Sequence, residues 1–186
     1  MRIDPTLYTG RPAEEREPVE QRCYDFLDAL GVPYCRVDHE CAETIAMCEE
    51  VEQVLGCKIC KNLFLTNRQQ TDFYLLLMPG EKPFKTKLLS KQIGTARLSF
   101  ATPEHMARLL DLTPGSVSVL GLLNDSDRKV RLLLDRDLEK EADFGCHPCR
   151  NSASLRFSTR ALLDSILPAL GYVPTWVELP WETEDA

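Results

Sequence analysis

The sequence predicts an α+β fold in which a mixed, mostly antiparallel sheet is packed by helices. Predicted helices and strands alternate irregularly along the chain, and two strands rich in apolar residues lie close enough to form a hairpin. A regular parallel arrangement would instead need a long crossover between successive strands. With 186 residues, 44% of them apolar, the chain fits one domain over residues 1–186, with an acidic tail at about 178–186.

The first part of the chain predicts two helices around a short strand, followed by a hairpin. Apolar residues at helical spacing predict a helix over residues 15–30 that ends at Gly31, and a second helix from about Thr44 to Gly56. The segment YCRVDH between them is expected to be extended. The apolar segments KICKNLFLTN and DFYLLLM flank a polar turn and predict the two strands of a β-hairpin.

The middle of the chain predicts short elements. A Lys-rich helix is expected near residues 86–93, followed by a short strand at LSF. Thr102 is a predicted N-cap with Pro103 in the first helical position, and this helix should end near Asp111. After a Thr-Pro-Gly turn, SVSVLGLLN and VRLLLD predict buried strands on either side of a polar corner.

The last part of the chain predicts a loop, two strands and a helix. GCHPCRN is interpreted as the loop, and alternating apolar residues from Ala153 to Phe157 predict the first strand. Ser158 is the expected cap of a helix that ends at Gly171, and YVPTWVEL is the predicted last strand.

Charge is unevenly distributed along the chain. The net charge is −7, which argues against a nucleic-acid partner, but residues 61–100 carry a net charge of +5. A basic segment of this kind is either a solvated surface or a surface that faces phosphates. The basic residues that we predict to bind RNA in the second case are Arg68, Lys82, Lys85, Lys87 and Lys91.

The cellular compartment also follows from sequence patterns. The first residues, MRIDPTLYTG, lack a basic flank followed by an apolar stretch, and the longest apolar run, residues 74–79, is too short to span a bilayer. We therefore expect a cytoplasmic protein with no membrane partner. In a reducing compartment the eight cysteines are expected to be buried thiols, metal ligands or catalytic groups rather than disulfides.

An ordered set of motifs carries a resemblance to a known family. In order, these are KNLFL, DFYLLLMPGEKP, RLSFA, LTPGSVSVLGLLND and GCHPCRNSASL. Together they resemble the prolyl-tRNA synthetase editing-domain superfamily, also called the YbaK family, and in particular its PrdX or ProXp-ala branch. The resemblance covers nearly the whole chain. It implies a mixed sheet with surrounding helices and hydrolysis of the ester in mischarged tRNA, most specifically Ala-tRNA(Pro), without a cofactor.

The resemblance also implies site residues. Lys61 corresponds to the family's functional lysine and would bind the phosphate of the terminal nucleotide, whereas the alternative is a strand-end lysine that reaches solvent. A Gly-x-x-x-Pro loop of the family corresponds to Gly115–Val119, where valine replaces the proline. His147 and Asn151 would position the substrate amine or the attacking water. The other residues that the resemblance assigns to substrate binding are Asn62, Gly115, Ser116, Val117, Ser118, Val119, Gly121, Asn124 and Pro148.

Two further hypotheses stay open at this point. The pairs Cys57/Cys60 and Cys146/Cys149 have the spacing of a four-thiolate zinc site, although the first pair runs directly into a strand, where residues three apart point to opposite faces. The second hypothesis is an inactive module of the same fold that binds tRNA or a synthetase, which the valine at position 119 favours. The expected partners are mischarged tRNA, specifically tRNA(Pro), and prolyl-tRNA synthetase, and the sequence carries no signal for an oligomeric state.

Overall fold

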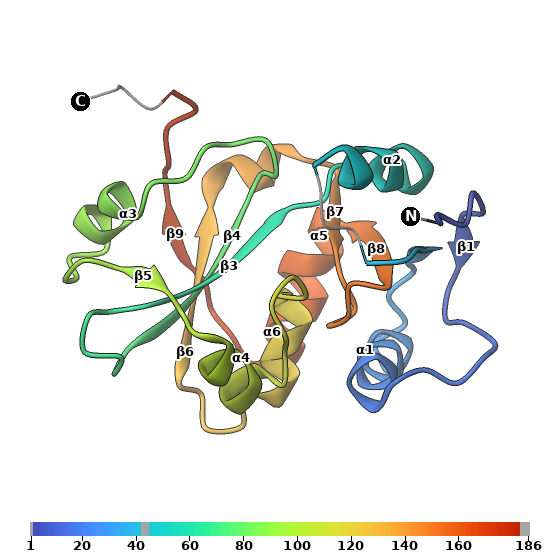
Figure 1. Ribbon diagram of the computed structural model, residues 1–186, viewed down its shortest axis with the longest axis horizontal. Coiled ribbons are helices and arrows are strands. Elements are labelled where there is room, and N and C mark those ends of the chain that lie inside the picture. Colours follow the sequence, from blue (N-terminus) through green and yellow to red (C-terminus); the bar gives the residue numbers. More distant parts are fainter. Residues whose placement is uncertain (1, 42–44, 183–186) are drawn as a thin grey trace.

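Two β-sheets share one hydrophobic core (Figure 1). The computed structural model describes residues 2–41 and 45–182. Within these residues no helix combines the length and the apolar composition that crossing a bilayer requires. The predicted start of the second helix at Thr44, and residues 183–186 of the predicted acidic tail, lie outside the described residues. The mixed α/β architecture with helices against the sheets confirms the predicted fold class.

The larger sheet contains the predicted hairpin and has five strands in the order β5-β3-β4-β6-β9. β3 pairs antiparallel with both β4 and β5, whereas β4–β6 and β6–β9 are parallel. β4 is buried along its whole length, as expected for a central strand between helices and loops. The strands are β3 (Lys61–Thr66), β4 (Phe73–Met78), β5 (Ser99–Phe100), β6 (Val130–Asp135) and β9 (Thr175–Val177).

The smaller sheet is entirely antiparallel, in the order β1-β2-β8-β7. Its strands are β1 (Tyr8–Thr9), β2 (Cys35–Asp38), β7 (Asp143–Cys146) and β8 (Ala153–Ser158). A single parallel bridge between Ile59 and Gly145 links β7 to the residues before β3. This link places the end of β7 beside the start of β3.

Most helices form where the sequence predicts them. They are α1 (Pro18–Ala29), α2 (Ile45–Leu55), α3 (Thr86–Gln92), α4 (Pro103–Leu110), α5 (Thr159–Ala161), η3 (Leu162–Ile166) and α6 (Leu167–Leu170). The Thr102 side chain accepts from the His105 amide and caps α4, and Ser158 caps α5 in the same way. α5, η3 and α6 form one continuous helical segment whose middle turn, η3, is π-helical and precedes Pro168. Gly171 ends it in the left-handed conformation.

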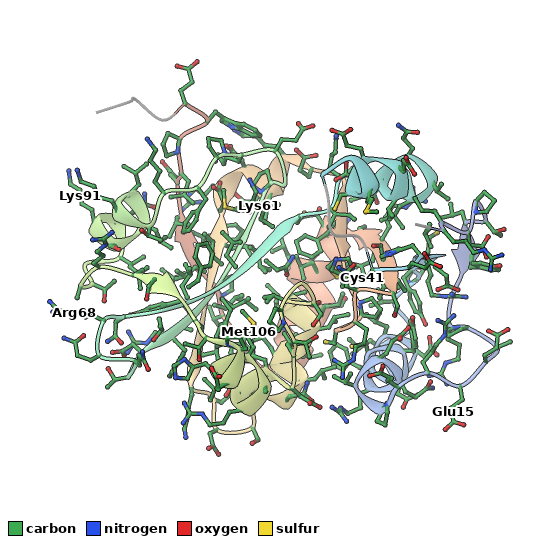
Figure 2. All side chains as sticks on the ribbon, in the orientation of Figure 1. Glu15, Cys41, Lys61, Arg68, Lys91 and Met106 are labelled. Carbon is green, nitrogen blue, oxygen red and sulfur yellow. The ribbon has the colours of Figure 1, made fainter. Side chains whose placement is uncertain are left out.

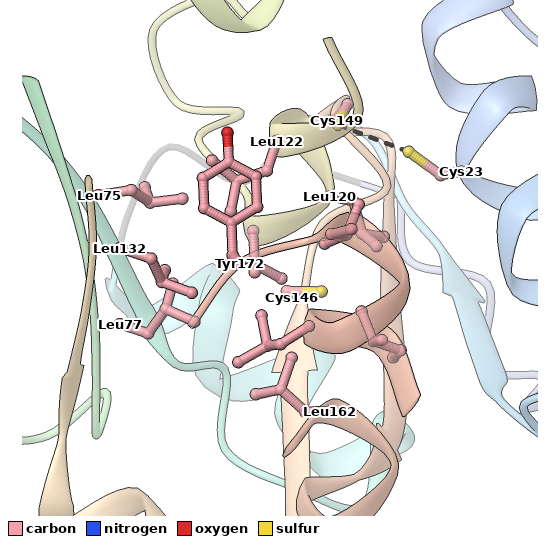
Figure 3. Packing of buried hydrophobic residues seen from close by; sticks show 14 of the residues in the cluster. Cys23, Leu75, Leu77, Leu120, Leu122, Leu132, Cys146, Cys149, Leu162 and Tyr172 are labelled. Atoms are coloured by element: carbon pink, nitrogen blue, oxygen red, sulfur yellow. Dashed lines mark hydrogen bonds between the residues drawn. The ribbon is translucent and has the colours of Figure 1, made fainter. Parts of the chain in front are cut away.

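The core lies between the two sheets, and the helical segment from α5 to α6 fills it (Figure 3). Leucines of β4 and β6 on one side and side chains of β7 and β8 on the other contact the helical residues between them. Figure 3 shows Leu75, Leu77 and Leu132 facing Leu162 and Cys146 across this core. The core fixes the position of the chain segments that leave it, including the end of β7.

Three predictions about local structure are wrong. SVSVLGLLN does not form a strand, because Val119–Asn124 is the 3₁₀-helix η1, capped by the Ser118 side chain. A second such helix, η2 (Arg136–Lys140), follows β6. GCHPCRN is a loop only from His147, because Gly145 and Cys146 pair in β7. The predicted single sheet is divided in two, and pattern alone did not indicate the two-residue strand β1.

Candidate active site

Three segments that are far apart in the sequence meet at one cavity of about 310 Å³. The first is the stretch from Ile59 to Phe64, which includes the start of β3. The second is the loop before η1, through Gly115 and Val117, and the third is the end of β7 with Cys146 and His147. Phe100 and Met106 complete the wall. Figure 2 shows Lys61 and Met106 on different elements around this region. The convergence predicted for positions 61, 115 and 147 is therefore present.

Lys61 supplies a cation to the lining of the cavity. It is the first residue of β3, is half-buried, and its Nζ donates a hydrogen bond to the backbone carbonyl of Lys82. Burial lowers the pKa of the Lys61 ammonium below its usual range. The carbonyl satisfies one of the three N–H donors of the ammonium, and an anion entering the cavity can accept from others.

Lys82 does not belong to an exposed basic surface, so its prediction as an RNA contact is wrong. Its side chain is 1% exposed, and its Nζ lies 2.9 and 2.8 Å from the two carboxylate oxygens of Asp135 and 2.8 Å from Asp137. Trp181 also donates to Asp137, at 2.7 Å. These partners compensate the buried charge, and they hold the Lys82 carbonyl where it can accept from Lys61.

Asn62 connects β3 to the loop that corresponds to the family's Gly-x-x-x-Pro element. Its Oδ1 accepts from the Val119 amide at 2.9 Å, and its Nδ2 donates to the Cys60 carbonyl at 3.0 Å. Proline has no N–H and could not make the first bond. The valine at position 119, itself buried, therefore gives this chain a connection from loop to strand that a proline would exclude.

Of this loop, Gly115 and Val117 line the cavity. Gly115 adopts a φ of 82°, in the left-handed region, and a Cβ at this position would lie 3.6 Å from the Asn151 amide nitrogen. Val117 lines the cavity beside it. Ser116 and Ser118 are buried, and their hydroxyls bond the backbone at Thr113 and Leu120. The two serine side chains thus stabilise the loop.

His147 lines the same cavity as Lys61. Its Nδ1 lies 2.9 Å from the Ala153 carbonyl, which can only accept, so Nδ1 carries the proton and Nε2 is an acceptor. Burial lowers the pKa of His147, and the nearby His39 lowers it further. His39 bonds the Ser154 hydroxyl at 2.9 Å, and that hydroxyl lies 3.4 Å from His147 Nδ1. At neutral pH the imidazole is uncharged.

Several other predicted site residues, three of them for substrate binding and Asn151 for catalysis, have structural contacts and do not line this cavity. Gly121 packs so closely that a Cβ would meet Leu112 at 2.8 Å. The Asn124 amide donates to the Leu110 carbonyl at 2.8 Å, and Pro148 is buried. Asn151 lies beside Gly115 and donates to the exposed Cys41 at 3.3 Å. Of this group, Asn151 is the one placed at the edge of the cavity.

The remaining predicted RNA contacts are exposed, as such a role requires. Arg68 lies in the turn between β3 and β4, Lys85 precedes α3, and Lys87 and Lys91 belong to that helix. Figure 2 shows Arg68 and Lys91 pointing outward at the edge of the molecule, with Lys61 nearer its centre. Their role in binding RNA stays a prediction.

The cysteines do not assemble into a four-thiolate site within the part of the chain that the structure describes. No group of three or more potential ligands is placed to hold a metal among those residues. Cys146 faces the core, and Cys149 contacts Cys23 with their sulfurs 3.5 Å apart (Figure 3). Burial raises the pKa of Cys146 well above that of a free thiol, which disfavours the thiolate that metal binding or nucleophilic attack needs.

Sequence reasoning did not identify the apolar lining of the cavity as part of the site, including Phe100 and Met106. Phe100 and Met106 had only been interpreted as residues of a short strand and a helix. The sequence shows an aromatic residue in the short segment LSF, but whether it is exposed beside a cavity depends on which elements lie next to it.

Comparison with known proteins adds a family and two kinds of relative. Residues 39–165 match the family profile of the aminoacyl-tRNA editing domain. The chain is 32% identical over 153 residues to prolyl-tRNA editing protein ProX of Acetoanaerobium sticklandii, covering 82% of this chain and 93% of that protein. It is also 28% identical over 155 residues to prolyl-tRNA synthetase associated domain-containing protein 1 of Danio rerio, covering 82% and 81% respectively.

Solved structures share the fold. One is described as a candidate trans-editing enzyme for prolyl-tRNA synthetase. It superposes with a TM-score of 0.64 at 19% identity, and the match covers 89% of this chain and 100% of that chain. Another, from work on epitope backbone grafting onto scaffold proteins by computational design, has a TM-score of 0.66 and 20% identity, covering 89% and 99%. At these identities the two structures establish a common architecture.

Proposed function

The chain belongs to the aminoacyl-tRNA editing domain family, and from this premise we propose that it removes alanine from mischarged proline tRNA. It is an aminoacyl-tRNA hydrolase that acts on mischarged tRNA. The observation that supports removal of alanine from proline tRNA is the convergence of Lys61, the loop at Gly115 and Val117, and His147 on one cavity. We further propose prolyl-tRNA synthetase as a partner and the cytoplasm as the location.

The reaction needs few reactive groups, because an aminoacyl ester is already activated. Water attacks the carbonyl carbon, the ester oxygen leaves with the terminal ribose, and the negative charge of the tetrahedral intermediate has to be stabilised by fixed donors. In our proposal the Lys61 ammonium binds the phosphate of the terminal nucleotide. Of the loop from Gly115 to Ser118, the backbone amides of Gly115 and Val117, which line the cavity, would face the oxyanion, whereas the Ser116 amide already donates to the Thr113 carbonyl.

His147 and Asn151 have positioning roles in this mechanism. The unprotonated Nε2 of a neutral His147 can accept a hydrogen bond from the substrate ammonium or from the attacking water. Asn151, beside Gly115, can orient the same groups from the edge of the cavity. The lowered pKa of His147 keeps the ring in the accepting form at neutral pH.

Selection of a small amino acid follows from steric exclusion. Val117, Cys146 and residues of β3 line the cavity together with His147, and in our proposal they limit the volume open to the amino-acid side chain. A pocket excludes a larger ring effectively, whereas discrimination against a substrate that is smaller by one methylene is limited to about 1–3 kcal/mol. An editing cavity that admits alanine and excludes proline uses the favourable direction.

The test is hydrolysis of a panel of tRNA(Pro) molecules charged with alanine, serine, cysteine or proline. We expect rapid release of alanine, little release of proline, and loss of activity in Lys61→Ala. Lys129→Ala is the matched control, because Lys129 is exposed and does not line the cavity. Equal rates for alanine and proline would contradict the specificity, and full activity in Lys61→Ala would remove Lys61 from the mechanism.

A further inference from the structure

Phe100 is an exposed aromatic side chain at the rim of the cavity. It is 58% exposed, yet it lines the same cavity as Lys61 and His147. The other large apolar side chains with comparable exposure, Val173 and Trp181, do not line it. Exposed aromatic surface beside a functional cavity is typical of a binding surface, because water contact with the ring is unfavourable until a partner covers it.

The ring is held in place from behind. Phe100 belongs to β5 and pairs with Leu65 of β3, and the next residue, Ala101, donates its amide to the Phe64 carbonyl at 2.9 Å. Phe84 contacts the ring edge to face, with centroids 6.2 Å apart and planes inclined at 70°. Backbone pairing and the second ring therefore limit the orientations open to Phe100, and its conformational freedom is reduced before any ligand binds.

The position along β3 sets the spacing between the ring and the cation. Phe100 lies opposite Leu65, four residues from Lys61 at the start of the same strand. At the rise of a β-strand, four residues span roughly 13 Å. The Lys61 ammonium bonds the Lys82 carbonyl, so the span to Phe100 is left for a nucleotide with its phosphate at Lys61 and its base toward Phe100.

We propose that the exposed face of Phe100 is the platform on which the terminal nucleobase of the RNA stacks. The inference rests on the RNA-binding part of the proposed function, to which it adds a subsite. Charge favours an RNA end as the occupant, because the exposed Lys85, Lys87 and Lys91 directly follow Phe84, the residue that contacts the Phe100 ring. Any of the four bases can stack on an aromatic ring. This subsite therefore holds the terminal nucleotide, whereas the residues around His147 select the amino acid.

The experiment measures binding of uncharged acceptor-stem RNA that ends either in the normal terminal nucleotide or in an abasic one. Removal of the base should weaken binding to the wild-type protein by roughly 5- to 100-fold, the range that stacking on an aromatic side chain supplies. In Phe100→Ala the two RNAs should bind with nearly equal Kd values. Phe100→Trp should retain the preference, and Phe100→Leu, which keeps apolar bulk without a ring, should lose most of it.

Val173→Ala is the matched control, because Val173 is 91% exposed and does not line the cavity, and it should behave as the wild type. Since Phe100 is more than half exposed, its variants should melt near the wild-type temperature, and the melting curve checks this. An undiminished base preference in Phe100→Ala would overturn the inference and assign the ring to another occupant. If the wild type prefers the intact RNA but releases no alanine from Ala-tRNA(Pro), the proposed specificity fails while the stacking subsite stands.

Discussion

Replacing Lys82 by methionine should destabilise the protein far more than replacing any exposed lysine. Lys82 is 1% exposed, and its ammonium compensates Asp135, whose side chain is equally buried, together with the partly buried Asp137. Methionine keeps most of the volume and removes the charge, which leaves a buried carboxylate without its cation. Breaking such a pair from one side costs about 3–5 kcal/mol. In a domain of this size that corresponds to a fall in Tm of roughly 6–20 °C.

Urea denaturation of wild type, Lys82→Met and Lys87→Met measures this effect. Lys87 lies in the same basic segment but is exposed, so Lys87→Met should change the free energy of unfolding by no more than about 0.5 kcal/mol. Adding Asp135→Asn to Lys82→Met should recover part of the loss, because the uncompensated charge is then gone. Deacylation should also fall in Lys82→Met, because loss of the ion pairs with Asp135 and Asp137 releases the backbone segment whose carbonyl at position 82 accepts from Lys61. Equal stabilities of the two single variants would refute the buried-cluster argument.

Three further predictions follow from contacts at the cavity. Asn62→Ala leaves the buried Val119 amide without its acceptor and should cost about 1–3 kcal/mol of unfolding free energy together with a loss of kcat/KM, measured by denaturation and deacylation. Gly115→Ala should cost about 1–2 kcal/mol because φ is 82°, and Gly115→Asn should cost less; equal melting temperatures for these two variants would contradict the backbone argument. Burial lowers the pKa of both His39 and His147 in the folded state. As the pH falls through the ordinary histidine pKa of about 6.5, the unfolded state therefore binds more protons than the folded state, and the free energy of unfolding should decrease. A free energy of unfolding that does not change between pH 5 and 7 would show that neither ring is held neutral.

Local signals allowed most elements to be predicted, because they depend on neighbouring residues. The cap at Thr102, the end at Gly171 and the hairpin formed by two apolar segments all follow from short-range stereochemistry or pairing. The segment SVSVLGLLN was interpreted wrongly because its apolar run suits a buried strand and a buried turn equally. Its choice of a 3₁₀-helix depends on the Ser118 cap and on the bond to Asn62, which is 57 residues away.

The candidate site was predicted unequally for the same reason. Lys61, Gly115 and His147 were found through an ordered set of motifs, and the cavity brings them together. Lys82 was assigned to the surface because a lysine in a basic segment is usually solvated, and its acidic partners are more than fifty residues away. The division into two sheets likewise depends on long-range pairing, which the pattern of any single segment does not contain.

The π-helical turn at Leu162–Ile166 has a consequence for comparing and redesigning this chain. A π-turn holds one residue more than the α-helical turn it replaces, and each residue rotates a helix by about 100°. Leu162 and Ile166 are both buried on either side of this extra residue. Deleting a single amino acid here would return the segment to an ordinary α-helical turn with both halves still against the core, whereas a deletion elsewhere in the same helical segment would rotate one half by about 100°. A one-residue gap should therefore be tolerated better at this turn than at other positions of the helix.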